Sequence, residues 1–213
     1  ALLLREPGAA SESHLVRHIE QHGPPSELVV SHIRLATRGE RSLQNTQPFM
    51  RELGGHTHVF AHNGELDGMM PQPGDARARF QPVGDTDSEL AFCRLLGRVA
   101  ALWMDSHEML PTVEARLELV AEFSAELRVS GIANFLYADS DTLFIHAHRR
   151  TPPGTVEVQP GLYVLERCCR EAVPDLSGSG VTLTTVRQAL TLVASVPLTG
   201  EPWRPLAEGE VLA

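Results

Sequence analysis

Cysteine, basic side chains and long apolar runs are scarce in this sequence of 213 residues. Its 18 Lys and Arg residues are outnumbered by 27 Asp and Glu residues, so the formal net charge is -9. A nucleic-acid-binding protein needs a basic surface to displace counterions, and no basic stripe is present. The longest apolar run, near Leu190 to Val196, is interrupted by Thr and Ser and falls short of the ~20 residues that cross a bilayer. Nucleic-acid binding and a membrane span are therefore not expected.

The three cysteines, Cys93, Cys168 and Cys169, are too few for a disulfide framework. Cys168 and Cys169 are adjacent, and neighbouring side chains in a strand point to opposite faces. Reduced thiols and a cytoplasmic location are the expected state.

The rest of the composition is that of a soluble globular protein, with 42% hydrophobic and 21% charged residues. No internal repeat or interdomain linker is visible, so we expect residues 1–213 to form a single domain. The chain opens with the apolar run Ala1-Leu2-Leu3-Leu4, which is typical of an internal strand rather than of a frayed terminus. We therefore expect an N-terminal portion to lie outside the printed sequence.

Apolar periodicity and capping residues predict segregated blocks of helix and strand. Helices are expected at residues 11–21, 85–103 and 111–128, and strands at residues 28–34, 56–61, 132–137, 142–147, 162–165, 182–184 and 192–195. Helical and strand segments that are grouped rather than alternating favour an α+β layered sandwich over a doubly wound sheet.

Three polar segments stand where strands end or helices begin. Arg34 lies in an apolar strand, where a guanidinium is costly unless a carboxylate pairs with it. Asn63-Gly64 is a strong turn dipeptide, but a side-chain amide and the next backbone N–H are also the two donors that an oxyanion needs in acyl transfer. Asp87 lies in a helix-capping segment and could also receive a substrate ammonium group.

Taken together, these segments resemble the class II glutamine amidotransferases, and in detail their stand-alone YafJ-like group. The resemblance depends on short motifs: His-Ile-Arg-Leu-Ala-Thr (32–37), Asn-Thr-Gln-Pro-Phe (45–49), Arg-Glu-Leu-Gly-Gly (51–55), Phe-Ala-His-Asn-Gly (60–64) and Pro-Val-Gly-Asp-Thr-Asp-Ser-Glu (82–89). The close match covers about residues 29–96. The chain departs from many family members at Gln47, where they have histidine.

The resemblance implies an N-terminal-nucleophile hydrolase fold, a four-layer αββα sandwich of two antiparallel sheets. It also implies roles for six residues. Arg34 would bind the α-carboxylate of glutamine and Asp87 its α-ammonium group. Asn63 and Gly64 would form the oxyanion hole, and Thr37 and His62 would support the pocket. The implied reaction cleaves the γ-amide of glutamine through a cysteine thioester, giving glutamate and ammonia.

In that family the nucleophile is a cysteine exposed at the processed N-terminus, with its own α-amine assisting proton transfer. None of the three printed cysteines has that position, so the printed residues alone are expected to be inactive. Two other functions stay open: hydrolysis of another γ-glutamyl amide, such as a peptide or thiol conjugate, and non-catalytic binding of a γ-glutamyl ligand. Any protein that accepts the ammonia is expected to be a separate partner.

A metal-dependent hydrolase is the contrasting enzyme class, because three histidine pairs have ligand-like spacing. The pairs are His14 and His18, His56 and His58, and His146 and His148. No nearby carboxylate or cysteine completes a tight ligand set in the sequence. No metal and no cofactor are therefore expected.

Overall fold

The computed structural model describes residues 1–33, 40–69, 77–105, 110–152, 154–167 and 189–213. Its largest element is an antiparallel five-stranded sheet with the strand order β1-β2-β3-β4-β10. The strands are β1 (Phe49–Leu53), β2 (His56–Asn63), β3 (Asn134–Ala138), β4 (Leu143–His146) and β10 (Val211–Leu212). Gly54 and Gly55, both at positive φ, make the tight turn between β1 and β2. The predicted hairpin near residues 132–147 is confirmed as β3 and β4.

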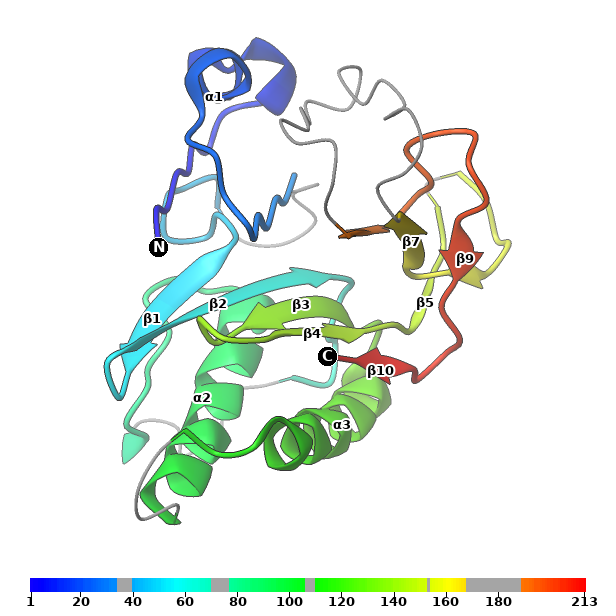
Figure 1. The fold of residues 1–213 in the computed structure, drawn as a ribbon. Coiled ribbons are helices and arrows are strands. Elements are labelled where there is room, and N and C mark those ends of the chain that lie inside the picture. The colour runs from blue at the N-terminus through cyan, green and yellow to red at the C-terminus, as the bar shows by residue number, and fades with distance from the viewer. Residues whose placement is uncertain (34–39, 70–76, 106–109, 153, 168–188) are drawn as a thin grey trace.

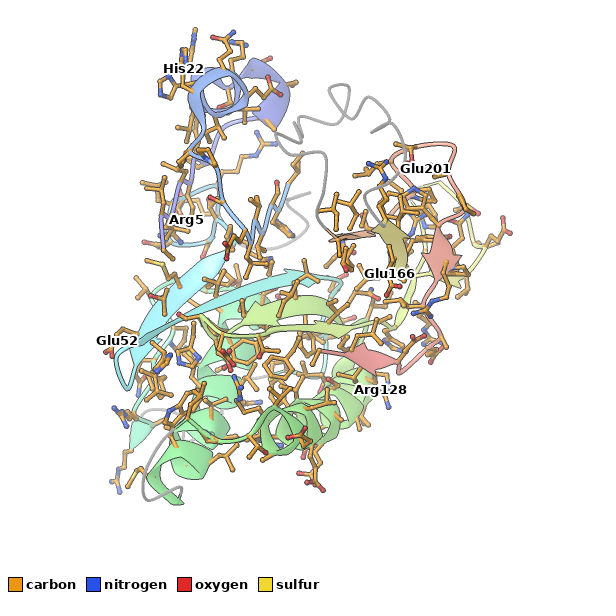
Figure 2. All side chains as sticks on the ribbon, viewed as in Figure 1. Arg5, His22, Glu52, Arg128, Glu166 and Glu201 are labelled. Carbon is orange, nitrogen blue, oxygen red and sulfur yellow. The ribbon has the colours of Figure 1, made fainter. Side chains whose placement is uncertain are left out.

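Two long helices, α2 (Asp87–Asp105) and α3 (Val113–Ser130), cover one face of this sheet (Figure 1). Side chains fill the space between the helices and the sheet (Figure 2). At the centre, the ring of Phe60 in β2 stacks on Phe92 in α2 at 5.3 Å and lies 5.2 Å from Phe135 in β3. All three rings are buried, and each contributes about 1.5–3 kcal/mol of hydrophobic stabilisation. Both helices were predicted from periodicity, with boundaries shifted by about two residues.

A smaller antiparallel sheet, in the order β8-β7-β9, packs over part of the opposite face. Its strands are β7 (Tyr163–Arg167), β8 (Leu190–Ala194) and β9 (Arg204–Pro205), and a two-stranded ribbon of β5 (Arg149–Arg150) and β6 (Gln159–Pro160) lies beside it. Ile145 of the large sheet belongs to one buried apolar cluster with Leu162, Val164 and Leu206. The predicted α+β class with stacked antiparallel sheets is therefore confirmed.

The N-terminal segment contains a short 3₁₀ turn, η1 (Ala10–Glu12), and the helix α1 (His14–His22). Ser13 caps α1 by accepting a hydrogen bond from the Val16 N–H at 3.0 Å, as its position predicts. This helix lies on the opposite side of the large sheet from α2 and α3 (Figure 1).

Two strand expectations need correction. Residues 1–4 and 28–33 form no strand, and Val29 and Ile33 are 73% and 76% exposed, so neither is part of a core. Strand β1 was not predicted, because its apolar residues alternate poorly around Arg51 and Glu52. The expected strand at 182–184 lies outside the described residues.

Candidate functional site

The end of β2 and the start of α2 meet at one end of the large sheet. Helix α2 runs back along β2, because three β2 side chains contact it in reverse order: His62 bonds Ser88, Phe60 stacks on Phe92, and His58 packs on Trp103. Because α2 and β2 run in opposite directions, Asn63 and Gly64 lie beside the first turn of α2. Four of the six predicted site residues therefore lie at the same end of the sheet: His62, Asn63, Gly64 and Asp87.

Asn63, the last residue of β2, and Gly64, directly after it, form an exposed turn. Gly64 has φ +155°, and a Cβ at this position would lie 1.9 Å from the carbonyl oxygen of Ile132. The turn is also tied to the loop before β3, since the Ile132 N–H donates to the Glu65 carbonyl at 2.9 Å. Gly64 is thus fixed by close packing, and the Asn63 side chain remains open to solvent, where it can meet a ligand.

Asp87 occupies the first turn of α2 and is held by two backbone donors. Its Oδ2 accepts from the Leu66 N–H at 2.7 Å, and its Oδ1 accepts from the Ser88 N–H at 2.7 Å. The bond to Leu66 connects the chain just after the Asn63–Gly64 turn to the start of α2. A half-buried carboxylate with a fixed orientation and spare lone pairs can bind an ammonium group.

His62 is 2% exposed and sits beneath this turn. Its Nε2 donates to the Ile132 carbonyl at 3.0 Å, because a carbonyl oxygen only accepts, and its Nδ1 therefore accepts from the Ser88 hydroxyl at 2.8 Å. Burial lowers the pKa of His62, although the Ile132 carbonyl and the nearby Asp87 charge oppose that shift. His62 is thus a neutral side chain that joins β2, α2 and the loop before β3.

Gln47 is a site-supporting residue that sequence reasoning missed. Its buried side-chain amide binds both backbone groups of His62: Oε1 accepts from the His62 N–H at 2.6 Å, and Nε2 donates to the His62 carbonyl at 3.1 Å. The Nε2 of His32 donates to the same carbonyl at 3.1 Å. The only available signal was its place within the 45–49 motif, where Gln47 stood out as a departure from the family.

Asn45 and Glu89 fix the start of α2 and were also missed as structural residues. The side chain of Asn45 accepts from the Asp85 N–H at 3.0 Å and donates to the Glu40 carbonyl at 3.0 Å. Glu89, 1% exposed, pairs with Arg51 of β1 and accepts from the Gly84 N–H at 2.7 Å. These bonds hold the turn before Asp87 against β1 and against the loop that precedes β1.

Arg34 and Thr37 lie outside the described residues, so their predicted roles stay predictions. His32, two residues before Arg34, is described and contacts the site through His62. Cys93 is buried in α2, as its place on an apolar helix face predicts. Cys168 and Cys169 lie outside the described residues.

The histidines of the proposed metal pairs make other contacts. In the pair nearest the site, His146 Nδ1 donates to the Ala133 carbonyl at 2.6 Å and its Nε2 accepts from Arg128 at 2.9 Å. His148 accepts from the Ala133 N–H at 3.3 Å through Nδ1 and contacts Glu208 through Nε2 at 3.1 Å. Within the described ranges, no group of three or more His, Cys, Asp or Glu side chains is arranged to hold a metal ion. The same ranges contain no helix with the length and apolarity that a membrane crossing requires.

Comparison with known proteins provides independent evidence. A family model described as glutamine amidotransferases class-II matches residues 1–213. YafJ of Escherichia coli (strain K12), named as a candidate glutamine amidotransferase, is 32% identical over 207 residues, which are 97% of this chain and 76% of YafJ. A candidate glutamine amidotransferase of Haemophilus influenzae is 34% identical over 144 residues, 68% of this chain and 47% of that protein.

A solved structure gives the same result for the fold. The crystal structure of a predicted glutamine amidotransferase from Pseudomonas aeruginosa has a TM-score of 0.62 and 34% sequence identity to this chain. The match covers 79% of this chain and 62% of that one. The fold expected from the sequence motifs is therefore confirmed.

Proposed function

The chain belongs to the class II glutamine amidotransferases, and we propose that it cleaves the γ-amide of glutamine to give glutamate and ammonia. One observation carries this proposal: the Asn63–Gly64 turn and the Asp87 carboxylate meet at one end of the sheet, joined by the bond from the Leu66 N–H to Asp87. An amide donor beside a fixed carboxylate suits a substrate that has an amino-acid head group and a carbonyl to be attacked.

In the proposed reaction, Asp87 binds the α-ammonium group and Arg34 the α-carboxylate. This arrangement selects an amino acid and fixes the distance to the γ-carbonyl. The side-chain amide of Asn63 and the N–H of Gly64 then stabilise the negative charge that develops on the γ-oxygen. Thr37 and His62 support the pocket, and the buried neutral ring of His62 does so without adding a charge beside Asp87.

The proposed nucleophile is the N-terminal cysteine of the family, which is not among the 213 printed residues. Its sulfur attacks the γ-carbonyl carbon, and its α-amine transfers the thiol proton to the departing nitrogen. The C–N bond breaks, ammonia leaves and a γ-glutamyl thioester remains. Water then cleaves the thioester, which releases glutamate and restores the thiol. Without that cysteine, the printed residues are proposed to bind the substrate but not to turn it over.

The substrate and the fate of the ammonia are parts of the same proposal. The chain spans 76% of YafJ and 47% of the H. influenzae relative. We propose that the ammonia is either released or passed to a separate acceptor protein, and that the reaction takes place in the cytoplasm.

The test uses the protein that begins with its processed cysteine. Ammonia release from glutamine is compared with release from γ-glutamyl peptides and γ-glutamyl thiol conjugates. Arg34→Ala and Asp87→Asn each remove a charge-assisted contact worth about 1.5–3 kcal/mol, so KM should rise roughly 10- to 100-fold. Glu114→Gln is the matched control, because Glu114 is an exposed carboxylate in the first turn of α3.

The outcomes separate the competing functions. Preferential turnover of glutamine supports the proposal, whereas preferential turnover of another γ-glutamyl amide replaces glutamine as the substrate. Binding of γ-glutamyl ligands without any turnover would make the protein a non-catalytic relative and would overturn the proposed reaction.

A further inference from the structure

Asn134, the first residue of β3, is a buried polar side chain that the function proposed above does not use. It is 0% exposed and lies opposite Asn63 in the β2–β3 pairing. Its Nδ2 donates to the carbonyl oxygen of Asn63 at 3.0 Å and to that of Arg149 at 2.9 Å. Its Oδ1 accepts from the His148 N–H at 2.7 Å. One amide therefore connects the end of β2 to the chain at the start of β5.

The chain around Asn134 leaves room for this side chain and for little else. A Cβ at Gly161 would lie 1.6 Å from Asn134 Oδ1 and 2.4 Å from its Cγ, so a larger residue at 161 would displace the amide. The Gly161 N–H itself donates to the His148 carbonyl at 3.2 Å. Because Gly161 has no side chain, the Asn134 amide fits against it, and the three hydrogen bonds fix the position and orientation of that amide.

The bond to Asn63 acts on the peptide group that matters most for the proposed reaction. The carbonyl oxygen of Asn63 and the N–H of Gly64 belong to one planar peptide unit and point in opposite directions. When Asn134 holds the oxygen, it also fixes the direction of the N–H. A hydrogen bond accepted by the carbonyl additionally polarises the peptide and strengthens its N–H as a donor.

We propose that Asn134 is a positioning residue that aims the Gly64 N–H into the oxyanion hole. This inference rests on the proposed function, because it assigns Asn134 a part in stabilising the same oxyanion. Asn134 touches the peptide behind the donor and not the substrate, so it acts on turnover and leaves the head-group contacts of Asp87 and Arg34 intact.

The first measurement is the kinetics of Asn134→Ala with glutamine, in the N-terminally processed protein and below its melting temperature. We expect kcat to fall by roughly 10- to 100-fold, because small misplacement of a reacting group costs up to about 10²-fold, while KM changes less than about threefold. Asn134→Asp is the second variant, since it keeps the size beside Gly161 and the acceptor for the His148 N–H but lacks the amide donor. At pH 8, the kcat of this second variant for glutamine should fall by a similar factor to that of Asn134→Ala.

The matched control is Tyr137→Phe in the same strand. The Tyr137 hydroxyl bonds the buried His58 of β2 at 2.7 Å, at the opposite end of β2 from the site. Removal of this hydroxyl should lower the melting temperature but leave kcat within about twofold of the value for the unaltered protein. If Asn134 had only a structural role, its variants would behave in the same way as this control.

A second readout does not depend on turnover. In the ¹⁵N-labelled protein, the backbone amide resonance of Gly64 should move in Asn134→Ala and stay in place in Tyr137→Phe. An unmoved Gly64 resonance, or an unchanged kcat in both folded Asn134 variants, would overturn the positioning role while the proposed function stands. If the unaltered, processed protein releases no ammonia from any γ-glutamyl amide, the proposed function fails and the positioning role fails with it.

Discussion

His146 makes the stability of this fold depend on pH in a way that can be calculated. Its ring, in β4, is 0% exposed and contacts Arg128 of α3. Burial lowers the pKa of His146 from 6.5 to about 4; the Ala133 carbonyl opposes this shift, and the Arg128 charge adds to it. A proton on Nε2 would face the Arg128 guanidinium, which lies 2.9 Å away. The folded protein therefore keeps this ring neutral.

Because the pKa is lower in the folded state than in the unfolded state, the unfolded chain binds more protons between pH 6.5 and pH 4. The stabilising contribution is complete above pH 6.5 and is lost as the pH falls through this window. One pKa unit corresponds to about 1.4 kcal/mol, so His146 should remove about 2 kcal/mol from the free energy of unfolding between pH 7 and pH 5. Burial also lowers the pKa values of His58 and His62, so the total loss should be larger.

Urea unfolding at pH 7 and pH 5 measures this loss directly. In His146→Gln, the amide can still bond the Ala133 carbonyl and Arg128 but does not titrate, so the decrease should be about 2 kcal/mol smaller than in the unaltered protein. The exposed His18 provides the control, and His18→Gln should leave the decrease unchanged. Equal decreases in all three proteins would refute the assignment of a buried neutral His146.

Two further predictions concern the support of the site and the cysteines. Gln47→Ala leaves the buried His62 N–H without its acceptor, so it should cost about 2–4 kcal/mol of stability and about 4–16 °C in Tm, measured by thermal unfolding. The same change at the exposed Gln81, whose side chain donates to the Ala78 carbonyl at 3.1 Å, should shift Tm by less than about 2 °C. Equal shifts would contradict the supporting role of Gln47 at His62. Cys93→Ser should keep full glutamine turnover, because Cys93 is buried in α2. A loss of kcat without a loss of folded protein would assign the thiol a catalytic part.

The sequence predicted the elements that carry strong periodicity or clear end signals. Helix α2 could be recognised from its apolar spacing and from Thr86, whose hydroxyl accepts from the Glu89 N–H at 3.2 Å at the start of the helix. The β3–β4 hairpin followed from the turn residues between two apolar segments. Strand β1 was missed because Arg51 and Glu52 interrupt its alternation, and only the pairing with β2 makes it a strand.

The candidate site was predicted as a set of residue types, but not as an arrangement. The motifs indicated His62, Asn63, Gly64 and Asp87, and these residues lie at one end of the large sheet. Their roles stay predictions. Nothing local in the sequence indicated that Gln47 would bind the backbone of His62, because that contact joins segments 15 residues apart through a side chain. Asn134 was missed for the same reason, since its bond to Asn63 spans 71 residues.

The oxyanion hole is the central claim, and Asn63 is the residue through which it can be tested. The N–H of Gly64 cannot be probed by a side-chain substitution, since a Cβ there would lie 1.9 Å from the Ile132 carbonyl oxygen. The Asn63 side chain, in contrast, is exposed and can be truncated without disturbing the core.

The decisive measurement is therefore kcat for glutamine in Asn63→Ala, in the protein that begins with its processed cysteine. Loss of one oxyanion donor should lower kcat by about 10²–10³-fold while KM changes little, because the head-group contacts are untouched. A folded Asn63→Ala protein with unchanged kcat would contradict the proposed site.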